Sequence, residues 1–391
     1  MDFKTGLEDY GIRKNGKVMR LGYTTGSCAA AASKAAAFML LSGMPKEEVS
    51  LMTPKGILLH LLIEDININK EEKTASCAVR KDGGDDPDVT DGALIYASVS
   101  LTGGPGIIID GGEGVGRVTK PGLDQGVGCA AINSAPRSMI TKELEEVRKK
   151  FKYEGGFNVI ISVPEGARIA KNTFNPRLGI EGGISILGTS GIVIPMSDSA
   201  LIESIKIEMN MLAEAGAEYI VLVPGSYGEA FARGHMDVDL KYSMKCSNFI
   251  GDVLETADNL GLSGLLFIAH IGKFIKLSGG IMNTHSHLGD CRSELMAAQA
   301  LRAGACLECA NQILASATSE EALDILARYG MLEKTMQVTI EKIQFYLENQ
   351  IKTGLETGTV IYSNKRGFLA ESANADELIK KINSQSLSPQ Q

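Results

Sequence analysis

Residues 219–228 read YIVLVPGSYG, and residues 265–273 read LLFIAHIGK. Each segment is a short apolar run that ends directly in a loop containing glycine, which is typical of strands buried on both faces. Helical patterns over residues 199–216 and 247–260 separate the apolar runs. Because alternating buried strands and helices favour a parallel sheet, we predict an α/β C-terminal domain with a small parallel sheet and flanking helices.

A third apolar run covers residues 183–187 and is extended by residues 192–194. We assign it to the same parallel sheet. Ligands of open parallel sheets bind outside the carboxyl ends of the strands, so we expect the loops after all three runs to form a single site. The residues in those loops that could contact a ligand through backbone or hydroxyl groups are Gly188, Thr189, Ser190, Gly191, Gly225 and Ser226, followed by His270 and Lys273.

The N-terminal half has a different pattern. An alanine-rich run opens with hydroxyl residues at Thr24 and ends at Gly43, which predicts a capped helix. Short strand patterns surround one further, charged helix at residues 138–151, and this mixture indicates an α+β domain. The chain is therefore divided into an α+β domain over residues 1–180, an α/β domain with a helical C-terminal part over 181–384, and a disordered tail over 385–391.

Composition excludes several classes of protein. The net charge of -8 argues against a general nucleic-acid surface and against an anionic membrane as the main partner. Seven scattered cysteines suggest reduced thiols and a cytoplasmic protein. The apolar stretches are too short for a membrane-spanning helix, which needs about 20 apolar residues. We expect a small-molecule partner, and the sequence leaves the formation of a homo-oligomer open.

Two polar segments lie in the N-terminal half. Thr24, Thr25 and Ser27 stand at the positive end of the alanine-rich helix, where they could hold an anion, although ordinary capping is favoured. Residues 81–92, KDGGDDPDVTDG, carry five aspartates that include Asp85 and Asp86. Their spacing does not match a calcium-binding EF-hand loop, so a solvated loop is the favoured interpretation.

The two histidines His285 and His287 have the spacing of metal ligands, but a lone His-x-His pair is a weak signal. They follow a glycine-rich segment and not a clear strand. They and His270 could instead donate hydrogen bonds or transfer protons. A metal-dependent hydrolase centred on His285 and His287 stays open as an alternative, while our main interpretation expects no protein-bound metal.

Basic side chains accompany the same loops. Lys273 and Lys276 directly follow an apolar run, and this position suggests a carboxylate partner. Arg177 and Arg292 lie near the other loops and have the fork geometry that suits carboxylates.

Five stretches of the chain are long and unlike common motifs: LGYTTGSCAAAASKAA (21–36), KDGGDDPDVTDG (81–92), GGEGVGRVTKPGL (111–123), NPRLGIEGGISILGTSGIVIPMS (175–197) and HIGKFIKLSGGIMNTHSHLGDCR (270–292). In these stretches and in their order the chain resembles the CbiD family, the cobalt-precorrin-5B C(1)-methyltransferases of anaerobic cobalamin synthesis. Two departures are minor: Gly83-Gly84 stands where a small residue and glycine are expected, and Asp91 where the family pattern has His.

The resemblance implies a first domain similar to a permuted ribosomal-S5-domain-2-like fold. It also implies methyl transfer from S-adenosylmethionine to C(1) of cobalt-precorrin-5B, giving cobalt-precorrin-6A. A non-catalytic corrinoid-binding carrier and a small-molecule kinase are alternatives, although the chain lacks a recognisable phosphate loop. Under the methyltransferase interpretation, we assign proton transfer to His270, His285 and His287. We assign the cofactor to Gly188, Thr189, Ser190, Gly191, Gly225 and Ser226. We assign the substrate to Thr24, Thr25, Ser27, Asp85, Asp86, Arg177, Lys273, Lys276 and Arg292.

Overall fold

The computed structural model describes residues 3–14, 16–173, 175–176 and 178–385. They form two compact units, Met1–Asp198 and Ser199–Gln391. The boundary lies after Asp198 and not at residue 180 as expected, because residues 183–194 pair with strands of the first unit. The expected tail falls almost wholly on residues 386–391, which are outside the described residues.

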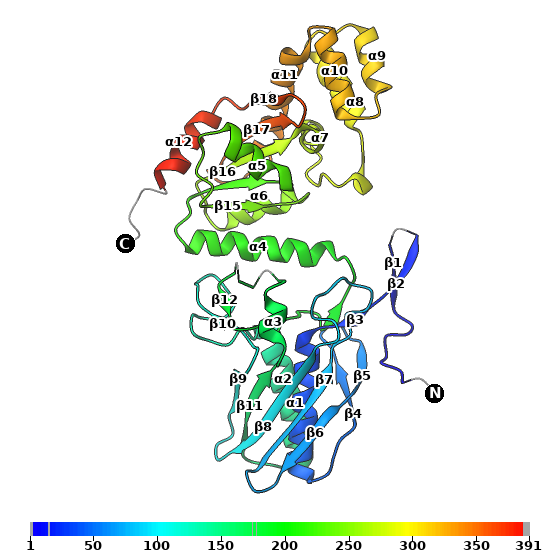
Figure 1. Cartoon of the computed structure of the whole chain (residues 1–391), viewed down its shortest axis with the longest axis vertical. Coiled ribbons are helices and arrows are strands. Elements are labelled where there is room, and N and C mark those ends of the chain that lie inside the picture. Colours follow the sequence, from blue (N-terminus) through cyan, green and yellow to red (C-terminus); the bar gives the residue numbers. More distant parts are fainter. Residues whose placement is uncertain (1–2, 15, 174, 177, 386–391) are drawn as a thin grey trace. The chain divides into compact units, whose positions relative to one another are not determined.

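The first unit is built on a five-stranded sheet in the order β6-β7-β8-β11-β9, shown in Figure 1. Neighbouring strands are antiparallel except for β9 and β11, which run parallel. This mostly antiparallel sheet with its separate helices confirms the expected α+β character. The strands are β6 (Glu64–Asn69), β7 (Thr74–Arg80), β8 (Leu94–Thr102), β9 (Ile107–Gly111) and β11 (Gly156–Ser162).

Helix α1 (Thr25–Ser42) packs against this sheet and against α2 (Ser134–Phe151). It begins at Thr24, whose side chain accepts a hydrogen bond from the Ser27 amide, and ends at Gly43 in the left-handed conformation. Its alanines are fully buried, because a side chain this small allows the helix backbone to approach the sheet closely. The alanine-rich pattern therefore predicted this helix and both of its ends correctly.

Short antiparallel pairs complete the first unit. One of them joins β3 (Gly22–Tyr23) to β13 (Ile192–Val193), and it brings the two ends of the unit together. Ile184 forms an isolated parallel bridge with Val115. The assignment of residues 183–187 and 192–194 to the C-terminal sheet is therefore wrong, because a buried apolar run does not specify its partner strand. The other short elements are β1 (Gly11–Lys14), β2 (Lys17–Arg20), β4 (Glu48–Met52), β5 (Leu58–Leu62), β10 (Arg117–Val118), β12 (Ile180–Glu181) and α3 (Gly166–Ala170).

The second unit contains a five-stranded sheet in the order β15-β14-β16-β17-β18. The first four strands in this order run parallel, and β18 runs antiparallel at the edge. The predicted parallel sheet is thus confirmed. Strand β15 was not predicted, because three residues give too short a pattern. The strands are β14 (Tyr219–Val223), β15 (Ser243–Lys245), β16 (Gly264–His270), β17 (Glu356–Ser363) and β18 (Gly367–Glu371).

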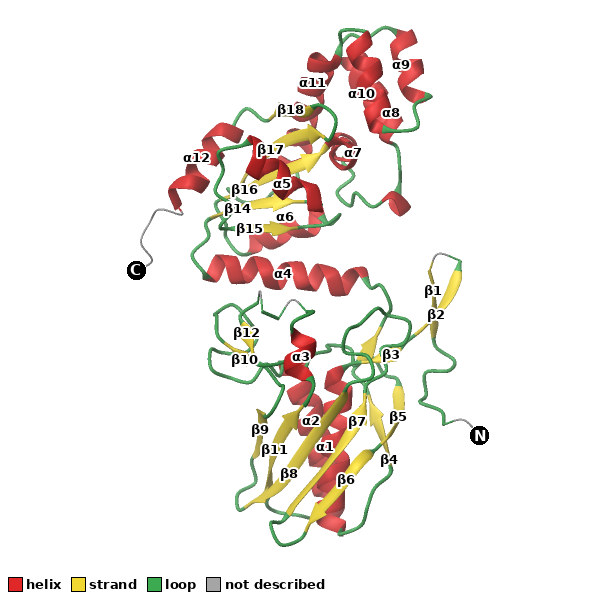
Figure 2. Cartoon of the chain, viewed as in Figure 1, coloured by secondary structure: helices red, strands yellow, loops and turns green. Residues whose placement is uncertain are grey.

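Helices cover both faces of this sheet (Figure 2). Val221 and Leu266 pack on one face with α5 (Ser226–His235) and α12 (Ala375–Gln385). Leu222 and Phe267, on the other face, pack with the remaining helices. No helix in the described part of the chain is both long enough and apolar enough to span a membrane. The remaining elements are α4 (Asp198–Glu214), α6 (Ile250–Asn259), α7 (Ile271–Phe274), η1 (Ile275–Gly279), η2 (Ser286–Leu288), α8 (Arg292–Arg302), α9 (Leu307–Leu314), α10 (Ser319–Arg328) and α11 (Leu332–Glu348).

Candidate functional site

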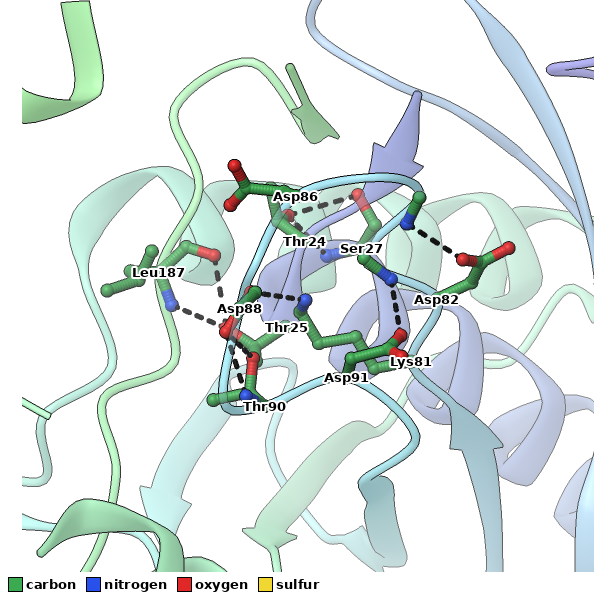
Figure 3. Close-up of polar contacts among 12 residues, drawn as sticks. Thr24, Thr25, Ser27, Lys81, Asp82, Asp86, Asp88, Thr90, Asp91 and Leu187 are labelled. Atoms are coloured by element: carbon green, nitrogen blue, oxygen red, sulfur yellow. Dashed lines mark hydrogen bonds and ion pairs between the residues drawn. The ribbon is translucent and has the colours of Figure 1, made fainter. Parts of the chain in front are cut away.

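The start of α1 is closed by residues 187–191 of the same unit. Thr25 Oγ1 donates to the Leu187 carbonyl at 3.2 Å and accepts from the Leu187 amide at 3.0 Å, as Figure 3 shows. Ser27 Oγ donates to the Gly191 carbonyl at 2.6 Å. Thr24, Thr25 and Ser27 are buried. The hydroxyl groups that were predicted to hold an anion are therefore engaged with the protein's own backbone.

Two glycines make this closure fit. A Cβ atom on Gly188, whose φ is +132°, would lie 2.3 Å from Thr24 Oγ1. A Cβ atom on Gly191 would lie 2.9 Å from Thr53 Cβ. Thr189 is exposed, and the Ser190 hydroxyl donates to the Ile192 carbonyl at 2.9 Å. This glycine-rich loop thus packs closely on the helix start, and its assignment to the cofactor stays a prediction.

The acidic loop is held together by its own carboxylates. Lys81, which is buried, donates from Nζ to Asp88 Oδ2 at 2.6 Å, and Asp88 Oδ1 accepts from the Thr90 amide and hydroxyl. Burial alone would raise the pKa of Asp88, but the Lys81 ammonium and the Thr90 hydrogen bonds hold it below its ordinary value. Asp91 Oδ1 accepts from the Gly83 amide at 2.7 Å. These bonds give Asp88 and Asp91 partners within the loop.

The two aspartates assigned to the substrate also bond within the unit. Asp85 Oδ2 accepts from the Arg20 amide at 2.6 Å, so it ties the acidic loop to β2. Asp86 Oδ1 accepts from the Met196 amide at 2.8 Å, which connects the loop to the end of the unit. Their contact with substrate stays a prediction, and in this structure one oxygen of each carboxylate bonds to backbone.

Loops at the carboxyl edge of the second unit's sheet converge on Lys273. Its Nζ donates to the Pro224 carbonyl, directly after β14, at 2.7 Å. Cys246, directly after β15, is buried, and this burial raises the pKa of its thiol to about 12. The nearby Lys273 charge opposes that rise. Burial lowers the pKa of Lys273 from its ordinary value. The expected convergence is therefore confirmed for the loops after β14 and β16, but not for residues 188–191.

His270, the last residue of β16, is half-buried and both of its ring nitrogens face a polar group. Nδ1 accepts from the Gly272 amide at 3.0 Å and so caps α7. Nε2 lies 3.4 Å from Glu320 Oε1, and the Tyr362 ring meets the imidazole edge-on at a centroid distance of 5.5 Å. Burial lowers the pKa of His270, while Glu320 opposes that shift. The imidazole is thus held in one orientation, with Nε2 as the nitrogen that carries the proton when the ring is neutral.

Two predicted substrate-binding cations have partners within the unit. Lys276 is buried, and its Nζ donates to the Thr284 and Gly289 carbonyls at 3.1 and 2.7 Å. It therefore positions the segment around His285. Arg292 forms a two-pronged ion pair with Asp290, with Nη2 2.9 Å from Oδ2. This hydrogen-bonded pairing raises the pKa of Arg292 and lowers that of Asp290.

His285 and His287 are exposed, and their rings stack at a centroid distance of 5.5 Å. His285 Nδ1 accepts from the His287 amide at 3.2 Å. In the described part of the chain, no group of three or more His, Cys, Asp and Glu side chains is arranged to hold a metal ion. The metal-hydrolase alternative therefore has no supporting geometry.

Arg177 and Ser226 are described less completely than the other predicted residues. Arg177 lies outside the described residues, and Ser226 is described only as the first residue of α5. A Cβ atom on Gly225 would meet no atom within 4 Å, so the space beside this backbone is open. Sequence reasoning missed Ser319 and Glu320, because nothing in the spacing connects them with His270. The only available signal was the Thr-x-x-Glu capping pattern that starts α10.

The comparisons with known proteins agree with this layout. Residues 12–195 match the family model described as CbiD, and residues 283–373 match the one described as CbiD, C-terminal domain. A cobalt-precorrin-5B C(1)-methyltransferase of Ruminiclostridium cellulolyticum is 46% identical over 382 residues, which cover 96% of this chain and 98% of that protein. The chain belongs to the CbiD family.

Two further proteins are similar to this chain. A cobalt-precorrin-5B C(1)-methyltransferase of Thermoanaerobacter sp. is 44% identical over 372 residues, covering 95% of this chain and all of that protein (100%). A crystal structure of the cobalamin biosynthesis protein cbiD from Archaeoglobus fulgidus is 27% identical, covers 74% of this chain and 88% of that chain, and has a TM-score of 0.39. A TM-score this low supports no argument about the fold.

The segments that resemble the CbiD family separate into two places. Four of them, at residues 21–36, 81–92, 111–123 and 175–197, contact one another in the first unit. For example, the Ile184 amide donates to the Gly114 carbonyl at 3.0 Å. The fifth segment, residues 270–292, starts at the carboxyl edge of the second unit's sheet. The family's motifs therefore mark one packed locus in the first unit and one sheet edge in the second.

Proposed function

We propose that this protein methylates C(1) of cobalt-precorrin-5B, with S-adenosylmethionine as donor, to give cobalt-precorrin-6A. The observation that carries this proposal is the 46% identity to a protein of that name over nearly the full length of both chains. The relatives reported above are named as methyltransferases, which favours this enzyme over a corrinoid-binding carrier or a small-molecule kinase.

The carboxyl edge of the parallel sheet is our proposed site for the donor. The space beside Gly225 is open, and it adjoins the Lys273 contact to Pro224. A ligand in this position would meet backbone groups after β14 and an ammonium group after β16. Edges of this kind are where open parallel sheets bind small molecules. Gly225 and Ser226 thus stay in the proposal for the donor and Lys273 stays in the proposal for the substrate, whereas residues 188–191 pack on α1.

The electron-rich ring carbon of the substrate supplies the electron pair for the new carbon–carbon bond, so no protein nucleophile is required. The protein has to align the donor methyl with that carbon and keep the reactants together, and positioning of this kind accelerates reactions strongly. The substrate carries several carboxylates, and Lys273 and Arg292 are our candidates to bind them. His270 is positioned by both of its nitrogens, and the exposed His285 and His287 are the remaining candidates for proton transfer.

Three finer statements also belong to the proposal. The first unit would be related to the permuted ribosomal-S5-domain-2-like fold, and its mostly antiparallel sheet with α1 and α2 supports this relation. The enzyme would work in the cytoplasm, in keeping with its free cysteines. The donor would be a diffusible substrate, with no protein-bound metal taking part.

Methyl transfer can be tested directly. The purified chain is incubated with cobalt-precorrin-5B and S-adenosylmethionine labelled with ¹³C at the methyl group, and the product is examined by mass spectrometry and NMR. We expect one labelled methyl group on C(1) and formation of S-adenosylhomocysteine. A chain that binds S-adenosylhomocysteine but transfers no methyl would contradict the substrate assignment, and a chain that binds neither ligand would contradict the enzyme assignment.

A further inference from the structure

Two cysteines lie three residues apart at the start of α9. Cys306 directly precedes the helix, and Cys309 lies in its first turn. The Ala310 amide donates to the Cys306 carbonyl at 3.1 Å, which fixes Cys306 as the residue at the helix start. Among the seven cysteines they are the one pair with Cys-x-x-Cys spacing, which also occurs in dithiols that exchange with disulfides. The surroundings of the two thiols decide whether they belong to that class.

The spacing allows the two sulfurs to meet. Residues three apart in a helix lie about 5 Å apart at Cα and project from the same face. A disulfide needs a Cα separation of about 4.4–6.8 Å, so a bond between Cys306 and Cys309 requires no unwinding of α9. Burial raises the pKa of the Cys309 thiol, and negative charge on the Cys306 thiolate raises it further. The two thiols are therefore close neighbours.

The two thiols differ in exposure. Cys306 is exposed, whereas Cys309 is 0% exposed and packs in the hydrophobic core of the second unit. A disulfide in solution can therefore reach Cys306 but not Cys309. The Cys306 side chain caps no amide of α9, so no capping bond has to break before its sulfur turns toward Cys309. An accessible thiol beside a shielded one that can close the ring is the arrangement that exchange requires.

Cys291 provides a comparison within the same unit. It is also exposed, and it directly precedes another helix, α8. Three residues later the chain has Glu294 in place of a second cysteine. Cys291 and Cys306 thus share their exposure and their place at a helix start, and they differ in the neighbouring thiol. A difference in their oxidation chemistry therefore reports on Cys309.

We propose that Cys306 and Cys309 form a redox-active dithiol that closes to a disulfide by exchange with a small disulfide such as oxidised glutathione. The Cys306 thiolate attacks one sulfur of the small disulfide, and the first small thiolate leaves. The Cys309 thiolate then attacks Cys306 Sγ, and the second small thiolate leaves. Two cysteine thiols are thereby oxidised, the small disulfide is reduced, and the two cysteine protons pass to the small thiolates. This proposal goes beyond the methyltransferase function and does not depend on it.

The test exposes the reduced, folded full chain to oxidised glutathione, blocks the remaining thiols and analyses the tryptic peptides by mass spectrometry. Residues 303–328 contain no Lys or Arg before Arg328, so one peptide carries Cys306 and Cys309 while another carries Cys291. We expect peptide 303–328 to lose two hydrogen atoms. Because ring closure is intramolecular, we expect the mixed disulfide with glutathione to be about tenfold scarcer at Cys306 than at Cys291.

Two variants identify the role of each thiol. Cys309→Ala removes the thiol that closes the ring and keeps a small apolar side chain in the core, so Cys306 should then retain one glutathione, as Cys291 does. Cys306→Ser should leave Cys309 unmodified, because no disulfide in solution reaches the buried thiol. Thermal unfolding of the reduced proteins checks that both variants are folded. Cys306→Ser changes an exposed position, so it keeps the test decisive if Cys309→Ala is unstable.

Several results would overturn the proposal. One is glutathione that persists on Cys306 of the unmodified chain, and another is a peptide 303–328 that stays reduced while Cys291 is modified. A disulfide from Cys306 to a second copy of the chain would also overturn it, and glutathione on Cys309 in Cys306→Ser would contradict the order of attack. Methyl transfer is assayed separately with the reduced chain, so failure of either proposal leaves the other standing.

Discussion

The start of α1 and the carboxyl edge of the second unit's sheet were both expected to bind ligands, and they differ in how their polar groups are paired. At α1 the hydroxyls of Thr25 and Ser27 bond to backbone of residues 187–191. At the sheet edge, the Lys273 ammonium bonds to the Pro224 carbonyl, and the space beside Gly225 is open. The hydroxyls at the first place therefore hold the fold together, whereas the backbone at the second place has room beside it. Substitutions at the two places should have different effects: loss of stability at α1, and loss of affinity at the sheet edge.

The largest effect is expected for Gly188→Ala. The new Cβ would lie 2.3 Å from Thr24 Oγ1 in a backbone conformation with φ of +132°, so the loop would have to move off the start of α1. We expect the free energy of unfolding to fall by about 4 kcal/mol, as for other overpacked or strained sites, measured by urea denaturation.

Gly182→Ala is the matched control for this substitution. Gly182 has φ of +81°, and its Cβ would meet no atom within 4 Å. Only the backbone cost of about 1–2 kcal/mol is then expected. Equal losses for the two variants would show that residues 187–191 do not close the helix start as described.

The second largest effect concerns the buried Lys81–Asp88 pair. Lys81→Met would leave the Asp88 carboxylate without its ammonium partner, and we expect a loss of about 3 kcal/mol in the free energy of unfolding. The double variant Lys81→Met/Asp88→Asn should recover part of that loss, because the unpaired charge is then gone. A double variant that is no more stable than the single one would argue against a pair that matters to the fold.

The same pair gives a dependence on pH. The pKa of Asp88 lies below its ordinary value of 3.8 in the folded state. Its stabilisation is therefore complete above the unfolded pKa and is lost as the pH falls through the folded pKa. Asp88→Asn should flatten the decline in stability below about pH 4, measured by thermal unfolding across the acid range. An unchanged decline in this variant would mean that other carboxylates account for it.

A substitution at the sheet edge should lower ligand affinity more than it lowers stability. Lys273→Met removes one hydrogen bond, to the Pro224 carbonyl, and an ammonium whose burial already lowers its pKa. We expect the free energy of unfolding to fall by only about 1 kcal/mol and the KM for the tetrapyrrole to rise about tenfold. Lys206→Met, at an exposed position on α4, is the control. If the free energy of unfolding fell sharply while the KM stayed unchanged, Lys273 would stabilise the fold, as the residues at the start of α1 do.

The smallest effect is expected for His270→Asn. An asparagine can keep the acceptor that caps α7 at the Gly272 amide, but it loses the contact with Glu320. If His270 only caps α7 and transfers no proton, kcat should stay within about threefold of its value in the unmodified protein, and the free energy of unfolding within about 1 kcal/mol. A large fall in kcat together with a changed pH profile would instead assign a proton to this imidazole.

Most elements of the fold were predictable from the sequence. The alanine run from Thr24 to Gly43 gave both helix ends, because capping chemistry is local. The run at residues 183–187 was placed in the wrong sheet, since strand pairing depends on partners far along the chain. The site was less predictable for the same reason. Lys273 follows a strand and could be found by position, whereas Ser319 faces the same edge from a helix about 50 residues later and has no local signature.

A hollow of the second unit, lined by residues 290–294 and 316–319 with Ala322, contains a natural chemical reporter. Cys291 is exposed in its wall, while Cys28, Cys77 and Cys246 are buried, with pKa values raised by burial to about 12. Alkylating reagents attack thiolates, so the buried thiols should stay unmodified in the native protein. The rate at which Cys291 is carboxymethylated, with Cys129 and Cys306 as internal references, then reads the occupancy of the hollow without any engineered label.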